Sequence, residues 1–215
     1  HSADHRYVTV TFFIAEGKRY KVGRVQISGN STFPEQKLLQ YTDLRENTYY
    51  DKKTYTLKKM TTEEYVRDGR FETIGVAIKH GGMPAMWVPK PDVEEALAAI
   101  DWSDKMVVCQ NTAFDGAIMA WRYGINPKVW TDIMGMSRAL YPHEKSHSLA
   151  SQAERASIGQ KGDAVVRALG KRYANFLSAD LEEDGEYCIN DVDLTYTLFE
   201  KYMALGFPLQ ELKLL

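Results

Sequence analysis

The fold of this 215-residue chain is decided in its back half by the stretch Lys105-Met-Val-Val-Cys-Gln-Asn-Thr-Ala-Phe-Asp115. Its first part, Met106–Cys109, is a short apolar run that indicates a buried strand. Asn111 follows where that strand ends, and Asp115 opens an amphipathic helix that continues to Tyr123. Polar residues at a strand-to-helix turn, within apolar surroundings, mark a candidate functional site.

The rest of the chain alternates strand-like and helix-like segments. Runs rich in β-branched and aromatic residues predict strands, and amphipathic runs behind capping residues predict helices. The predicted strands are Tyr7–Ile14, Tyr20–Ser28, Phe71–Lys79, Ala85–Val88 and Lys105–Gln110, and the predicted helices are Pro34–Gln40, Asp92–Ile100, Asp115–Tyr123, Thr131–Leu140, Ser146–Ile158, Ala164–Tyr173 and Glu183–Leu205. Helices around buried strands after residue 90 predict an α/β protein.

Composition excludes several classes of protein. The chain is 44% hydrophobic and 26% charged, which is ordinary for a globular protein, and its net charge of −2 gives no overall basic field. It contains no run of about 18 apolar residues, so no transmembrane segment is expected. Residues 1–53 hold nine Lys/Arg and six Asp/Glu, for +3, which leaves −5 for the remainder. This small step in charge suggests two segments of different origin.

A second polar group lies on the last predicted helix, in Tyr187-Cys-Ile-Asn-Asp191. The spacing of four puts Tyr187 and Asp191 on one helix face. Carboxylates such as Asp115 and Asp191 can hold divalent metals through oxygen, and two metals about 4 Å apart can drive phosphodiester hydrolysis. A tyrosine one turn before a metal-binding carboxylate can orient the attacking water. The alternative from spacing alone is structural, with Asp115 as a helix cap and the other two residues at a surface.

These two groups resemble the second and third motifs of the DEDD 3′–5′ exonucleases, in the branch that carries a tyrosine. Residues 109–124 and 186–195 resemble exonuclease domains of phage-type family A DNA polymerases, and the similarity covers about 48–215. The resemblance implies an RNase H-like fold, a mixed sheet with flanking helices, that acts on single-stranded DNA 3′ ends with Mg²⁺ or Mn²⁺. It implies Asp115, Tyr187 and Asp191 as catalytic residues and Asn111 and Phe114 as substrate-binding residues. Asp115 and Asp191 are the implied metal ligands.

The first motif of that family, Asp-x-Glu on the central strand, is missing. In relatives the strand runs directly into a segment that stands here as Thr48-Tyr-Tyr-Asp51, and counting back puts Arg45 and Asn47 at the two acidic positions. Loss of these carboxylates, with a cation added, disfavours divalent metal. We therefore expect a 3′–5′ exonuclease-like domain that is inactive or severely impaired.

The front of the chain resembles a different family. Residues 15–30, 32–39 and 44–51 are similar to a POTRA domain, a periplasmic module of outer-membrane β-barrel assembly factors. The similarity covers about 7–53, and it makes Tyr7–Ile14 the last strand of a preceding repeat. POTRA modules bind protein partners by β-augmentation at exposed sheet edges. A protein-binding module, or a hybrid with no activity, is therefore the alternative to the exonuclease-like function.

The two resemblances divide the chain into a POTRA-like segment, 1–53, and an exonuclease-like domain, 54–215. They leave residues 54–90 open: these extend the POTRA-like β-α-α-β-β unit to about residue 90, or they stay in the exonuclease sheet while a strand from the front fills the empty first position. The exonuclease resemblance implies a cytoplasmic location and the POTRA resemblance a periplasmic one. A natural fusion and a designed chimera both give this sequence.

Overall fold

The computed structural model of the chain describes residues 7–14, 20–21, 49–50, 61–69, 71–162, 172–208 and 210–211. Two predictions, the strand Tyr20–Ser28 beyond Lys21 and the helix Pro34–Gln40, lie outside these residues. The same holds for Arg45 and Asn47 and for nearly all of the predicted helix Ala164–Tyr173.

The described strands form two sheets. The strands are β1 (Tyr7–Ile14), β2 (Tyr20–Lys21), β3 (Tyr49–Tyr50), β4 (Thr73–His80), β5 (Met86–Pro89), β6 (Met106–Cys109) and β7 (Val129–Asp132). The main sheet has the order β5-β4-β1-β6-β7, and β2 and β3 form a separate antiparallel pair. In the main sheet β4 runs antiparallel to its two neighbours β5 and β1, whereas β6 and β7 run parallel to β1.

The centre of the main sheet is β1, which lies between β4 and β6. The antiparallel pairing of β1 with β4 runs from Val8–His80 to Ile14–Thr73, and its parallel pairing with β6 runs from Tyr7–Met106 to Thr9–Val108. A strand from the front therefore occupies the centre of the sheet, as in one of the two arrangements that the sequence leaves open, and β4 and β5 lie in the same sheet. Tyr7–Ile14 is buried on both faces, as its dense apolar run allows.

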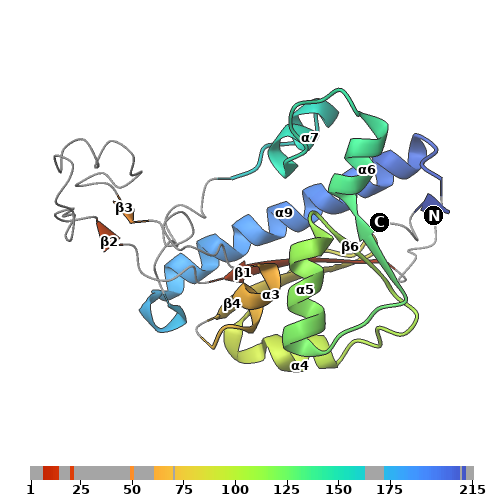
Figure 1. Cartoon of the computed structure of the whole chain (residues 1–215). Coiled ribbons are helices and arrows are strands. Elements are labelled where there is room, and N and C mark those ends of the chain that lie inside the picture. Colours follow the sequence, from red (N-terminus) through yellow and green to blue (C-terminus); the bar gives the residue numbers. More distant parts are fainter. Residues whose placement is uncertain are drawn as a thin grey trace, which may run out of the picture.

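Helices cover both faces of the main sheet (Figure 1). They are α3 (Thr62–Arg67), α4 (Val93–Ala98), α5 (Thr112–Tyr123), α6 (Ile133–Leu140), α7 (Leu149–Ala156) and α9 (Ser178–Ala204), with short 3₁₀ turns η1 (Lys90–Asp92) and η2 (Tyr173–Asn175). α9 packs on β1, β4, β5 and β6, and α6 and α7 pack on α9. α3, α4 and α5 lie on the other face, with α3 against α5 (Figure 1).

The core follows this layering. On the α5 face the apolar side chains of β1, Val8, Val10 and Phe12, pack with Ile118 and Met119. On the α9 face two further clusters join the sheet to the long helix, and Leu198 is among the fully buried side chains there. Full burial of one such side chain contributes about 1.5–3 kcal/mol, so α9 is held along most of its length by packing.

The observed architecture confirms the predicted class, a mixed α/β sheet flanked by helices. The start of the predicted helix Thr131–Leu140 was wrong, because residues 131 and 132 end strand β7, which was not predicted, and the helix starts at Ile133. Four residues behind Pro127 are too few for a periodic strand signal. Within the described part of the chain, no helix combines the length and the apolar character that a membrane span needs.

Candidate functional site

Asp115 lies in the first turn of α5, just beyond the carboxyl end of β6. Its carboxyl group accepts hydrogen bonds from the backbone amides of Phe12, on the central strand, and Asn111. Burial raises the pKa of Asp115 to about 7, the two amides oppose the change, and the nearby carboxylates of Asp132 and Asp191 add to it. In such surroundings, a nearby positive charge stabilises the ionised form of the carboxyl group.

The two predicted substrate-binding residues both precede Asp115 in the sequence but have different surroundings. Asn111 is the N-cap residue of α5, and its carbonyl accepts the amides of Phe114 at 2.9 Å and Asp115 at 3.0 Å. Phe114 is half-buried and stacks on Tyr65 of α3, with ring centroids 6.2 Å apart. Asn111 therefore holds the turn that carries Asp115, and Phe114 packs between α3 and α5. Their role in binding stays a prediction.

Tyr187 and Asp191 lie one turn apart on α9, and both side chains face the sheet. They are 8% and 5% exposed. The Tyr187 hydroxyl donates a hydrogen bond to the Asp191 carboxylate, and burial together with that carboxylate raises the pKa of Tyr187 to about 12. Because Asp191 also acts electrostatically on Asp115, the structure brings the two motifs together at one end of the sheet.

A lysine that the sequence analysis does not single out joins this group. The Nζ atom of Lys161 lies 3.3 Å from Oδ2 of Asp191 and 5.6 Å from the centroid of the Tyr187 ring. Burial lowers the pKa of Lys161, but Asp191 and Tyr187 together raise it by more, so the side chain stays a cation. No sequence pattern marks this contact, because 30 positions separate Lys161 from Asp191 and a loop brings them together.

The central strand contributes no carboxylate to the site. Phe13 packs with Tyr187, Cys188 and Val192, so the odd-numbered residues of β1 face α9. Thr11 therefore lies on the same face, and it is partly exposed. The amide of Phe12, which contacts Asp115, stands between these two residues. Neither Thr11 nor Phe13, the two residues of β1 on this face next to the Phe12 amide, carries a carboxyl group.

Asp132, at the end of β7, is a third carboxylate near the site, and burial raises its pKa. Its side chain accepts the amide of Met134 at 2.9 Å and so caps α6. The sequence carries a signal for this role, because an aspartate directly before an apolar helical run is a typical N-cap. Asp132 therefore stabilises the start of α6 and increases the negative potential at Asp115.

The described side chains do not fit a pair of divalent metals. Within residues 7–14, 71–162 and 172–208, no three His, Cys, Asp or Glu side chains gather as a metal site would require. Asp132 and Asp191 are the described carboxylates that act electrostatically on Asp115, and the ammonium of Lys161 already pairs with Asp191. Metal sites for Mg²⁺ need several oxygen ligands, and a neighbouring cation opposes a second positive charge.

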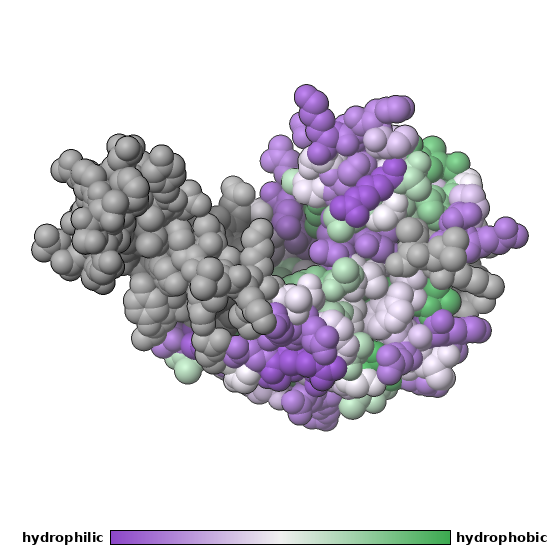
Figure 2. All heavy atoms as spheres, viewed as in Figure 1, coloured by the Kyte–Doolittle hydropathy of each residue, from purple (hydrophilic) through white to green (hydrophobic). Residues whose placement is uncertain are grey.

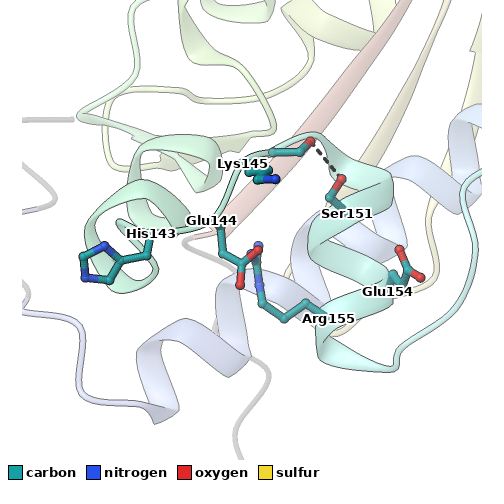
Figure 3. A pocket seen from close by; sticks show the side chains of 7 residues that line it. His143, Glu144, Lys145, Ser151, Glu154 and Arg155 are labelled. Atoms are coloured by element: carbon teal, nitrogen blue, oxygen red, sulfur yellow. Dashed lines mark hydrogen bonds and ion pairs between the residues drawn. The ribbon is translucent and has the colours of Figure 1, made fainter.

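A separate cavity of about 470 Å³ lies between the loop after α6 and helix α7 (Figure 3). It is lined by His143, Glu144, Lys145, Ser146, Ser151, Glu154 and Arg155. Hydrophilic side chains gather over this part of the surface (Figure 2). Its two basic residues are balanced by two glutamates, and Arg155 pairs with Glu144 at 3.6 Å. None of the predicted site residues lines this cavity.

Comparisons with known proteins give two different signals. The POTRA family model, described as a surface antigen variable number repeat, matches residues 20–93. Among solved structures, the chain is similar to NrnC of Brucella melitensis with bound Mg²⁺, with a TM-score of 0.57 and 11% identity over 94% of this chain and 74% of that one. The apo form of a nuclease matches with a TM-score of 0.50 and 18% identity, over 65% of this chain and 66% of the other. No curated protein sequence matches.

These findings support the two halves of the sequence interpretation at a coarse level. The main sheet and its helices have a nuclease-like fold, and a POTRA signature covers the segment from β2 to the start of α4. The POTRA match includes β4 and β5, which lie in the same sheet as β1 and β6. The boundary between residues 1–53 and 54–215 stays a prediction.

Proposed function

We propose that this chain is a 3′–5′ exonuclease-like domain that binds single-stranded DNA 3′ ends and hydrolyses them poorly or not at all. One observation carries the proposal: Asp115, Tyr187 and Asp191 meet beside a central strand that presents Thr11 and Phe13. The arrangement retains the second and third motifs of the tyrosine-bearing exonucleases, as found in phage-type DNA polymerases. It lacks the acidic pair of the first.

The physical reason for impairment is electrostatic. Two-metal hydrolysis depends on carboxylates that hold both ions and stabilise the charge that develops on the phosphate. In this site Asp115 and Asp191 are the candidates for Mg²⁺ or Mn²⁺, and Lys161 neutralises one of them. Loss of one donor to a transition-state charge commonly lowers kcat by about 10²–10³. Loss of two first-motif carboxylates is expected to lower it further.

Degradation of a 5′-labelled single-stranded oligonucleotide, with Mg²⁺ or Mn²⁺ present, tests the impairment. We expect no degradation above that of the Asp191→Ala variant, which serves as the control for contaminating nuclease. Robust degradation that Asp191→Ala abolishes would show that the site is active and that the argument from β1 is wrong.

Restoration of the first motif is the sharper test. Thr11→Asp with Phe13→Glu puts two carboxylates on the face of β1 that looks toward α9. We expect this pair to gain metal-dependent hydrolysis that Asp191→Ala removes. Arg45→Asp with Asn47→Glu is the matched comparison, because it adds the same charges at the positions that the sequence spacing indicates. Metal-dependent hydrolysis in the Arg45→Asp/Asn47→Glu variant but not in the Thr11→Asp/Phe13→Glu variant would show that the first motif corresponds to residues 45–47.

A second candidate function rests on the POTRA match. This match includes β5, which forms one edge of the main sheet and exposes 60% of Met86. A free edge strand is the place where a protein partner adds by β-augmentation. A POTRA-type role also points to the periplasm, so the compartment stays a prediction. Disulfide crosslinking of a partner peptide to a cysteine at Met86, compared with one at Lys128, distinguishes edge binding from non-specific contact.

A further inference from the structure

The loop formed by residues 157–162 is fixed against α9 beside the candidate site. The Nδ2 atom of Asn190 donates a hydrogen bond to the carbonyl of Gln160 at 3.1 Å. Two residues later, Gly162 approaches the helix so closely that a Cβ there would lie 3.1 Å from Cδ2 of Tyr187. The residue between these two contacts is therefore held over the site, and that residue is Lys161.

The geometry around Lys161 is that of a cation bound to a buried carboxylate. Its ammonium lies 3.3 Å from Oδ2 of Asp191, whose side chain is 7% exposed, whereas the lysine side chain is 33% exposed. The carboxylate thus lies inside the protein, whereas the lysine side chain is partly exposed to solvent. The other oxygen, Oδ1 of Asp191, is buried and has no hydrogen-bond partner among the described residues. The single positive charge of Lys161 thus balances the single negative charge of Asp191.

Among the residues that the structure describes, the acidic groups of the site are too few for two divalent ions but suit one monovalent cation. β1 supplies Thr11 and Phe13 where carboxylates would be needed, and Asp132 is engaged as a helix cap. A buried carboxylate without a compensating cation is strongly destabilising, so Asp191 requires a positive partner. The ammonium of Lys161 meets this requirement from within the chain.

We propose that the Lys161 ammonium takes the place of a divalent metal at Asp191 and binds a phosphate oxygen of the single-stranded DNA end without metal. A lysine ammonium has three N–H donors. Asp191 lies 3.3 Å from the ammonium, and the lysine side chain is 33% exposed, so a donor remains for a phosphate oxygen. The inference rests on the proposed function, because that function supplies the DNA end as ligand. A charge-assisted bond of this kind changes affinity by about tenfold or more.

The first test measures the fluorescence anisotropy of a 5′-labelled single-stranded oligonucleotide with the full chain, in EDTA and in Mg²⁺. We expect equal affinity in the two conditions and a loss of about tenfold or more in Lys161→Gln. Lys161→Arg, which keeps the charge, should stay close to the parent. Lys128→Gln is the matched control, because exposed Lys128 precedes β7 at the end of the strand remote from Asp132. Thermal unfolding of each variant separates lost binding from lost folding.

The second test measures Mn²⁺ binding to the protein alone by electron paramagnetic resonance. We expect the parent and Asp191→Asn to bind Mn²⁺ equally, because the lysine already serves the carboxylate. A bound Mn²⁺ that is present in the parent and absent in Asp191→Asn would overturn the inference.

The outcomes distinguish this inference from the proposed function. DNA binding that requires Mg²⁺, or that Lys161→Gln leaves unchanged, overturns the role of Lys161 and leaves the exonuclease-like function standing. Absence of DNA binding in both conditions overturns the proposed function, and the phosphate-binding part of the inference with it. In that case the Mn²⁺ result still decides whether Lys161 stands in for a metal.

Discussion

Asp115→Asn is expected to stabilise the protein at alkaline pH and to have little effect at acidic pH. Asp115 has a pKa of about 7 in the folded chain, against an ordinary value of 3.8, chiefly because of burial. In the folded protein the carboxyl group thus keeps its proton up to about pH 7, whereas in the unfolded chain it loses the proton near pH 4. The folded state binds more protons between these values, so the free energy of unfolding falls as the pH rises through them.

The size of the effect follows from the two pKa values. Each pKa unit corresponds to about 1.4 kcal/mol, so a difference between 3.8 and about 7 corresponds to at most about 4 kcal/mol. The full destabilisation is present above pH 7 and is relieved as the pH falls toward 4. Asparagine has no charge to bury and can still accept the backbone amides, so Asp115→Asn should remove this pH-dependent part.

Urea unfolding between pH 4 and pH 8 measures this difference directly. We expect the stability of Asp115→Asn relative to the parent to increase by about 2–4 kcal/mol across that range. Asp92→Asn is the matched control, because Asp92 is exposed and makes no capping bond to α4. A difference between Asp115→Asn and the parent that stays constant with pH would refute the argument that Asp115 is held in its protonated form.

Two further predictions concern packing and the loop over the site. Gly75→Ala should lower the free energy of unfolding by about 1–3 kcal/mol or more, because its Cβ would lie 2.2 Å from Trp87 and 2.8 Å from the carbonyl oxygen of Val88. Gly82→Ala is the control and should be near neutral, because a Cβ there would have nothing within 4 Å. Equal urea midpoints for the two variants would contradict this prediction. Asn190→Ala removes the 3.1 Å hydrogen bond to the carbonyl of Gln160 in the 157–162 loop, so trypsin should cut after Lys161 faster than in the parent. Mass spectrometry of the fragments measures the rate. An unchanged rate would mean that this bond does not hold the loop.

Local patterns were enough to predict the elements that carry the site. Met106–Cys109 is a strand, α5 follows it, and the spacing of Tyr187 and Asp191 places them on one face of α9. These features depend on neighbours in sequence, and their periodicity reports them directly. The class of the fold follows from the same segments, because strands that alternate with helices form a sheet with helical layers.

Long-range contacts explain what the sequence did not reveal. Tyr7–Ile14 is correctly predicted as a strand, but nothing in its residues specifies that its partners are β4 and β6. Its resemblance to a POTRA strand and the spacing of Thr48–Asp51 favour another central strand, and a strand from the front is one of the two arrangements that the sequence leaves open. The contact between Lys161 and Asp191 also joins residues far apart in sequence, and the loop that brings the ammonium to the carboxylate has no recognisable motif.

The position of β1 in the main sheet determines how much chain can be inserted between β1 and β4. β1 and β4 are antiparallel neighbours, an arrangement that a two-residue turn can close, yet residues 15–72 stand between them. The entropy of loop closure grows only with the logarithm of length, and each doubling adds about 0.6 kcal/mol. The main sheet therefore sets almost no limit on the length of chain placed at this connection. It is a site where evolution or an engineer can graft a foreign module and keep the sheet intact.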